Sequence, residues 1–167
     1  ALAPLLKADG IFLGELHGTV EVPALMECLA QRLVDEFAGR RPLRVALEMP
    51  RAALDEAHPF WRVQDGRASL AMRHLLRQLK ALEVQGRLTV SGFVPADAPA
   101  DPAQYEQAMA RELDQTPPEA FLLALAGNLH ARKSKADISL SKQAYAGAGA
   151  LLQRRMAHVL IDHRQPS

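Results

Sequence analysis

Residues 10–19 read GIFLGELHGT, and this stretch decides the fold because an apolar run passes directly into polar residues and glycines. The part over 10–15 is too apolar for a strand with one face in water, so we expect it to be covered on both faces of a sheet. Three later apolar runs also end in polar residues, and these ends read LEMP at 47–50, FVPAD at 93–97 and GNLH at 127–130. If the runs lie side by side in one sheet, their ends converge on a single cleft.

Helical segments separate the apolar runs. Stripes of apolar residues predict a helix from Glu21 to near Gly39, a second over residues 68–85 and a third over 105–114. The expected strands cover residues 10–15, 44–49, 88–94, 121–126 and 156–162. Strands joined by helices of this length pair in parallel through right-handed crossovers. We therefore predict one α/β domain over residues 1–167, with a parallel-rich central sheet of about five strands and helices on both faces.

Composition excludes several classes of protein. The chain has 167 residues and a net charge of +1, which argues against non-specific nucleic-acid binding through a basic surface. Its single cysteine, Cys28, rules out an internal disulfide and a multi-cysteine metal site, and its apolar neighbours predict that it is buried. The longest apolar run, residues 120–127, is too short to cross a bilayer. No signal peptide is visible, but the chain begins at Ala1, so its compartment stays open.

Four polar residues at the ends of the apolar runs are the candidate site. Glu15 and His17 are two positions apart and share a face in extended backbone, while Glu48 and His130 end two other runs. Two imidazoles and two carboxylates in one cleft suit general acid–base catalysis, in which a histidine activates water. They also suit a metal held by His17, Glu48 and His130, with an open position for substrate. The residues alone do not choose between these two kinds of site.

Each candidate also has a simpler structural interpretation. Glu15 could pair with Arg44 or Arg51, and Glu48 could accept backbone amides of the next turn. Only the convergence of all four favours a functional site. The chain lacks the Gly-rich dinucleotide and nucleotide motifs and the G-x-S-x-G elbow, so we do not expect a covalent serine hydrolase. The aromatic stretch after His58, residues 59–61, would either cover a hydrophobic ligand or pack in the core.

Three motifs resemble one superfamily. GELHGTVE at 14–21, ALEMP at 46–50 and AGNLHARK at 126–133 are similar to the motifs of erythromycin esterase-like proteins, ChaN-like haem-binding proteins and Tiki/TraB proteins. The shared pattern is G-E-x-H after the first strand, a glutamate after the second and a later histidine. Here these are Gly14 to His17, Glu48 and His130. The resemblance covers most of the chain, from about Gly10 to Lys133.

This resemblance implies an α/β fold but more than one function. Esterase-like members imply a water-activating histidine supported by glutamates, acting on a small molecule. Tiki members imply a metal-dependent peptidase at similar positions. ChaN-like members imply haem as cofactor, pairing as a homodimer and a place in the periplasm or cell envelope, often as a lipoprotein. We expect a hydrolase with water as nucleophile, with haem binding in iron uptake as the alternative.

Overall fold

The computed structural model describes residues 3–136 and 145–161. In chain order its elements are η1 (Leu5–Lys7), β1 (Gly10–Glu15), α1 (Glu21–Phe37), β2 (Leu43–Pro50), η2 (Arg51–Leu54), η3 (Pro59–Arg62), α2 (Leu70–Val84), β3 (Thr89–Val94), α3 (Pro102–Asp114), β4 (Phe121–Gly127), α4 (Asn128–Ala131), β5 (Lys135–Ala136), β6 (Tyr145–Ala146), α5 (Ala148–Leu151) and β7 (Met156–Leu160). The predicted strands and long helices are therefore present, with bounds shifted by a few residues. The predicted last strand ends at Leu160, and Asp162 lies outside the described residues.

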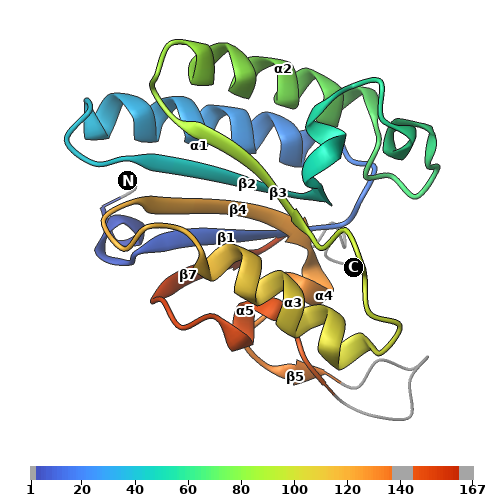
Figure 1. Cartoon of the computed structure of the whole chain (residues 1–167). Coiled ribbons are helices and arrows are strands. Elements are labelled where there is room, and N and C mark those ends of the chain that lie inside the picture. The colour runs from blue at the N-terminus through green and yellow to red at the C-terminus, as the bar shows by residue number, and fades with distance from the viewer. Residues whose placement is uncertain (1–2, 137–144, 162–167) are drawn as a thin grey trace, which may run out of the picture.

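Five of these strands form one sheet in the order β3-β2-β4-β1-β7. Every neighbouring pair in it is parallel, so the predicted parallel α/β architecture is confirmed. The short strands β5 and β6 pair antiparallel in a separate ribbon. Helices α1 and α2 cover one face of the sheet, and α3, α4 and α5 lie on the other (Figure 1).

Alternation along each strand divides the core into two apolar clusters. In β1, Ile11 and Leu13 belong to the cluster beneath α1 and α2, whereas Phe12 belongs to the cluster beneath α3 and α5. The same division separates Leu123 from Ala124 in β4. Because both faces are covered, the strands are continuous apolar runs, as the sequence indicated. The polar residues after the strand ends are thus held at the edge of a rigid layer.

After β4 the chain turns to one face of the sheet, whereas after the two neighbouring strands, β1 and β2, it turns to the other. After β1 and β2 the chain continues to α1 and α2, on one face, but after β4 it turns into α4, on the other (Figure 1). Such a reversal opens crevices at the carboxyl edge of a parallel sheet, which is where ligands of open α/β sheets bind. The fold therefore places its crevice around Gly127, between the ends of β1 and β2.

One burial prediction from the sequence is wrong. Cys28 was expected to be buried, but it is exposed, and its neighbour on the same side of α1, Leu25, is 40% exposed. The helix instead buries Met26, Leu29 and Leu33 against the sheet, which turns Cys28 toward the side of the helix.

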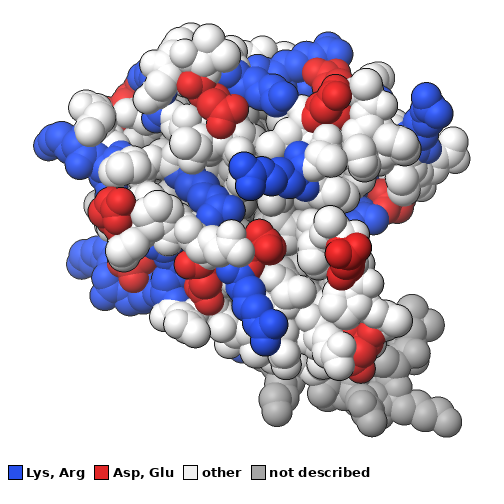
Figure 2. Space-filling model, viewed as in Figure 1, with Lys and Arg blue, Asp and Glu red and all other residues white. Residues whose placement is uncertain are grey.

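In the described residues no helix is both long and apolar enough to span a membrane. Basic and acidic side chains are interspersed on the face shown in Figure 2.

Candidate functional site

The structure brings all four predicted site residues together at the carboxyl edge of the sheet. Glu15 ends β1 and His17 follows it, Glu48 lies near the end of β2, and His130 lies in the short helix α4 directly after β4. Glu15 and Glu48 are 4% and 7% exposed, so both carboxylates are largely removed from water. Burying a charge is costly without a partner. Each carboxylate must therefore be compensated, and the partners of each define the site.

Glu15 and His17 form the first pair. His17 Nδ1 lies 2.9 Å from Glu15 Oε1, so the carboxylate receives a hydrogen bond from the ring. His17 therefore places its other nitrogen, Nε2, away from Glu15. That nitrogen lies 3.6 Å from Glu48 Oε2. The alternative partners expected from the sequence, Arg44 and Arg51, are not used, because Arg44 donates instead to Ser91, Thr116 and the Glu112 carbonyl oxygen.

Glu48 is the centre of this group of residues, which we call the cleft because a crevice is expected at this edge of the sheet. Its Oε2 accepts a 2.7 Å hydrogen bond from the backbone N–H of Gly127, and its Oε1 accepts one from Arg67 Nη1 at 3.3 Å. His130 Nε2 lies 3.6 Å from Oε1, while His17 Nε2 lies beside Oε2. One buried carboxylate is therefore flanked by two imidazoles, one at each oxygen. The structural role expected for Glu48, acceptance of a backbone amide, coexists with this central position.

His130 has its own buried carboxylate, which the sequence analysis missed. Glu106 of α3 is 1% exposed, and its Oε1 lies 2.7 Å from His130 Nδ1. The other oxygen of Glu106 accepts the backbone N–H of Ala148, also at 2.7 Å. The ring of Tyr105 packs edge-on against His130, with centroids 6.0 Å apart. A signal for Glu106 did exist in the sequence, since it lies on the same helical stripe as Met109, Ala110 and Leu113.

Arg67 is the second functional side chain that the sequence did not single out. It reaches Glu48 from the loop before α2, and its Nε also donates to Asp65 Oδ2 at 2.8 Å. Gly66 holds this loop in place, with φ at +88° and its Cα packed on the backbone of His17 and Gly18. A Cβ at Gly66 would lie 2.7 Å from the Gly18 nitrogen. Only glycine permits this approach, and it sets the Arg67 guanidinium beside the cleft.

Both histidines hold protons more tightly than a free imidazole. Burial disfavours the charged form of His17, but its hydrogen bond to Glu15 and the charge of Glu48 outweigh burial and raise its pKa. Burial also opposes protonation of His130, and the hydrogen bond to Glu106 with the charge of Glu48 raises its pKa. The Tyr105 hydroxyl keeps its proton, because burial and the nearby Glu48 carboxylate raise its pKa. The site can therefore accept and hold protons.

The residues expected to hold a metal have suitable donor atoms, but they are not arranged as a metal site. Two imidazole Nε2 atoms and one carboxylate are suitable ligands for a hydrolytic metal, and Glu15 and Glu106 would orient the rings. However, Arg67 and the Gly127 N–H already donate to the oxygens of Glu48. Among the described residues, no group of three or more His, Cys, Asp or Glu side chains is arranged to hold a metal ion. The arrangement is that of a network of hydrogen bonds and ion pairs.

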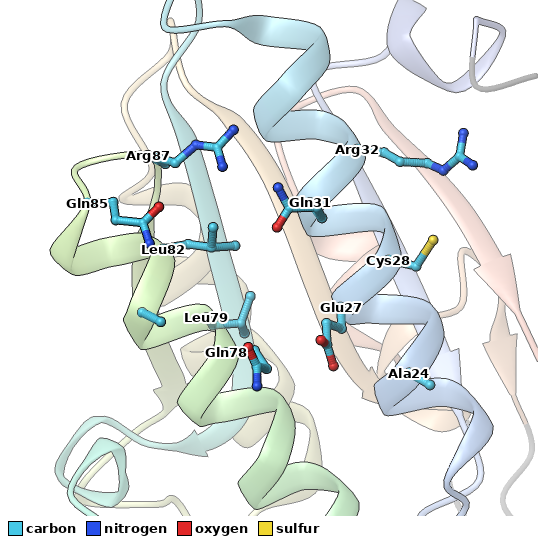
Figure 3. A pocket seen from close by; sticks show the side chains of 11 residues that line it. Ala24, Glu27, Cys28, Gln31, Arg32, Gln78, Leu79, Leu82, Gln85 and Arg87 are labelled. Atoms are coloured by element: carbon cyan, nitrogen blue, oxygen red, sulfur yellow. The ribbon is translucent and has the colours of Figure 1, made fainter.

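Two other candidate sites lack this concentration of groups. Phe60 and Trp61 are 7% and 6% exposed and pack in the core, with Trp61 Nε1 donating to the Ala53 carbonyl oxygen, so they do not cover the cleft. A groove of about 760 Å³ runs between α1 and α2. Figure 3 shows Glu27 and Gln31 of α1 facing Leu79 and Leu82 of α2 across it. The groove is a solvated surface feature, and none of the four predicted site residues lines it.

Comparison with known proteins defines the class of fold. No protein-family model and no curated protein sequence matches the chain. Among solved structures it is similar to ChaN of Campylobacter jejuni, described as binding haem cofacially, with a TM-score of 0.62 and 16% identity over 99% of this chain and 86% of that one. It is also similar to a MARTX toxin effector domain, RRSP, from Vibrio vulnificus CMCP6, with a TM-score of 0.60 and 16% identity, covering 97% of this chain and 35% of that one.

A third similar structure is described under bacterial protein toxins, with a TM-score of 0.57 and 18% identity over 97% of this chain and 36% of that one. The chain thus spans 86% of the ChaN chain and about a third of each toxin chain. These likenesses confirm the α/β fold that the resemblance implied. The protein is an α/β protein with a ChaN-like fold, and its function must be argued from its own cleft.

Proposed function

We propose that the protein is a hydrolase of the esterase or peptidase type that uses water as its nucleophile. The observation that carries the proposal is the pair of imidazoles, each with Nδ1 on a buried glutamate and Nε2 directed at Glu48. A histidine oriented by a carboxylate is the usual general base for activating a nucleophile. The similarity in fold to toxin effector domains and to ChaN is compatible with this chemistry but does not select it.

In the proposed reaction His17 is the general base. Its Nδ1–H donates to Glu15, which fixes the tautomer and leaves Nε2 free to take a proton from a water beside Glu48. Glu48 orients that water through Oε2. The water attacks the carbonyl carbon of an ester or amide, and Arg67 stabilises the negative charge that develops on the carbonyl oxygen. His130, whose pKa is raised, donates a proton to the leaving oxygen or nitrogen.

The test is a panel of ester and peptide substrates, assayed with and without added divalent metal. We expect turnover in wild type and a loss of about 10²-fold to 10⁴-fold in His17→Ala, as for removal of a general base. His74→Ala is a matched control, because His74 is an exposed histidine of α2 outside the cleft. The proposal fails if no substrate turns over under any condition and His17→Ala behaves as wild type in every assay.

The same assay tests the expected metal set of His17, Glu48 and His130. Chelation followed by dialysis should leave the rate unchanged if Arg67, rather than a metal ion, balances Glu48. Elemental analysis of the purified protein gives an independent answer. A stoichiometric metal that is lost in Glu48→Gln would overturn the metal-free mechanism.

The second candidate function is haem binding at the cell envelope, which the absorption spectrum of the protein with hemin would test. It is favoured by the similarity to ChaN, which extends over nearly the whole chain. The described residues fit haem less well, because Phe60 and Trp61 are committed to the core and the cleft is lined by charged groups. Titration with hemin decides the question. A saturable Soret shift that is lost in Tyr105→Phe or His130→Ala would establish this function, and its absence would exclude a specific site.

A further inference from the structure

We infer that Glu106 is a positioning residue that fixes the tautomer of His130, so that the cleft contains two matched glutamate–histidine pairs acting on Glu48. This inference deepens the proposed hydrolase function and rests on it. Glu106 lies outside the G-E-x-H, glutamate and histidine motifs from which the site was first recognised. It reaches the site from α3, on the other side of the sheet from the helix that follows His17.

The contacts of Glu106 define its role. Its Oε1 lies 2.7 Å from His130 Nδ1, and its Oε2 accepts the backbone N–H of Ala148 at 2.7 Å. Because an ionised carboxylate only accepts hydrogen bonds, Nδ1 of His130 must carry the hydrogen. In the neutral ring Nε2 then has a free lone pair. This is the nitrogen that lies 3.6 Å from Glu48 Oε1.

The backbone around Ala148 is built to hold Glu106 in this orientation. Gly147 packs so closely on α4 that a Cβ there would lie 2.5 Å from the carbonyl oxygen of Leu129 and 3.1 Å from that of His130. Glycine at this position lets the chain bring the Ala148 N–H up to the carboxylate beside the histidine it orients. Tyr105, the neighbour of Glu106, packs edge-on against the ring of His130. The plane and the tautomer of this imidazole are therefore both fixed from α3.

The same contacts predict an unusual result for Glu106→Gln. The Ala148 N–H is a donor, so the glutamine must turn its carbonyl oxygen toward Ala148 and its NH₂ group toward His130. His130 Nδ1 then has to accept, and the hydrogen moves to Nε2. The substitution keeps the size of the side chain and the Ala148 hydrogen bond, yet it reverses the tautomer at the nitrogen that faces Glu48.

The experiment records long-range ¹H–¹⁵N correlation spectra of the histidine rings at a pH where His130 is neutral. We expect the Nδ1–H tautomer for His130 in wild type and the Nε2–H tautomer in Glu106→Gln. Glu112→Gln, the same change six residues further along α3, is the control and should leave the His130 signals unchanged. An unchanged tautomer in folded Glu106→Gln would overturn the inference, whatever the activity.

Kinetics provide the second readout and separate this inference from the proposed function. With a substrate from the panel, Glu106→Gln should lower kcat by about 10²-fold to 10⁴-fold and leave KM within a few-fold, because the neutral glutamine no longer stabilises the His130 imidazolium that donates the proton. A reversed tautomer with full activity would contradict the catalytic part of the inference. If no substrate is found for wild type, the proposed function fails while the tautomer measurement still decides the role of Glu106.

Discussion

The groove between α1 and α2 and the cleft around Glu48 offer two very different settings for a ligand. The groove encloses about 760 Å³, and its walls include the exposed side chains of Arg32, Gln78 and Gln85 above a floor of Leu79 and Leu82. The cleft brings together two partly buried histidines and three glutamates, and each of the three glutamates is less than 10% exposed. The groove therefore has space for a ligand, whereas the cleft has charged groups that are largely shielded from water.

This contrast shows why the cleft is the better place to expect chemistry. A charged group in contact with water interacts weakly, because water screens it, whereas the same group in a buried network polarises its neighbours. Burying such a network lowers the stability of the fold, so its presence is best explained by function. The polar groups in the groove are solvated and need no special explanation. The experiments below separate the two regions, beginning with the largest expected difference.

Glu48→Gln should give the largest effect. The amide keeps the shape and can still accept the Gly127 N–H, but the charge between the two imidazoles is lost. We expect hydrolytic activity to fall by about 10²-fold to 10⁴-fold. Gln78→Ala in the groove should change the rate less than about two-fold, since surface changes are usually small. Equal effects of the two variants on initial rates would remove the distinction between cleft and groove.

Gly127→Ala should impair the site without unfolding the protein. The backbone at Gly127, with φ −57° and ψ 148°, suits alanine, but the new Cβ would lie 3.0 Å from His17 Nε2 and 3.6 Å from Glu48 Oε2. The His17 ring must therefore move by a few tenths of an ångström. We expect a rate loss of about 10-fold to 10²-fold, because small misplacements of catalytic groups are costly. Thermal unfolding should stay close to wild type, and a wild-type rate would show that the cleft tolerates movement.

Gly66→Ala and Gly86→Ala compare the two regions through backbone strain. Both glycines have positive φ, +88° and +70°, so alanine should cost each about 1–2 kcal/mol. A Cβ at Gly86, beside the groove, meets nothing within 4 Å, whereas one at Gly66 would lie 2.7 Å from the backbone of His17. Gly66→Ala should therefore cost about 1–3 kcal/mol more in urea unfolding and lower the rate as well. Equal losses in the free energy of unfolding would mean that the close contact at Gly66 does not affect stability.

The smallest effect concerns histidines outside the cleft. His158 in β7 places Nδ1 2.6 Å from the Ala131 carbonyl oxygen, and its burial lowers its pKa below 6.5. Below pH 6.5 the unfolded chain binds this proton more readily than the folded one, so folding stability should fall as the pH drops. His158→Gln should weaken this acid dependence in denaturation curves between pH 5 and 7. His17 and His130, with raised pKa values, should contribute in the opposite direction.

The sequence was sufficient to predict the fold and half of the cleft. Continuous apolar strands alternating with amphipathic helices are a strong pattern, and the polar residues that follow them in the chain, such as His17, have fixed places in a parallel sheet. The predicted burial of Cys28 was wrong, because which side of a helix faces the sheet depends on its packing. The residues at the strand ends were predicted correctly because the local sequence is enough to locate the end of a strand.

The other half of the cleft depends on contacts between distant segments. Arg67 reaches Glu48 only because Gly66 packs on Gly18, and no periodicity connects residues so far apart in the chain. Glu106 did carry a local signal, an acidic residue on the apolar stripe of α3, but that signal does not reveal His130 as its partner. Chain topology determines such pairings, which is why the motifs identified the edge of the sheet and not the full network.

The scattering of the cleft along the chain has a consequence for when activity can arise. Its parts come from the ends of β1, β2 and β4, from α3 and from the loop before α2, and the last contact needs the backbone of Ala148. During synthesis from the N-terminus, a chain that ends before Ala148 lacks at least one support of the two glutamate–histidine pairs. The proposed activity should therefore appear only once the chain has folded as far as Ala148. A measurement of that activity would then report folding of the chain through α5.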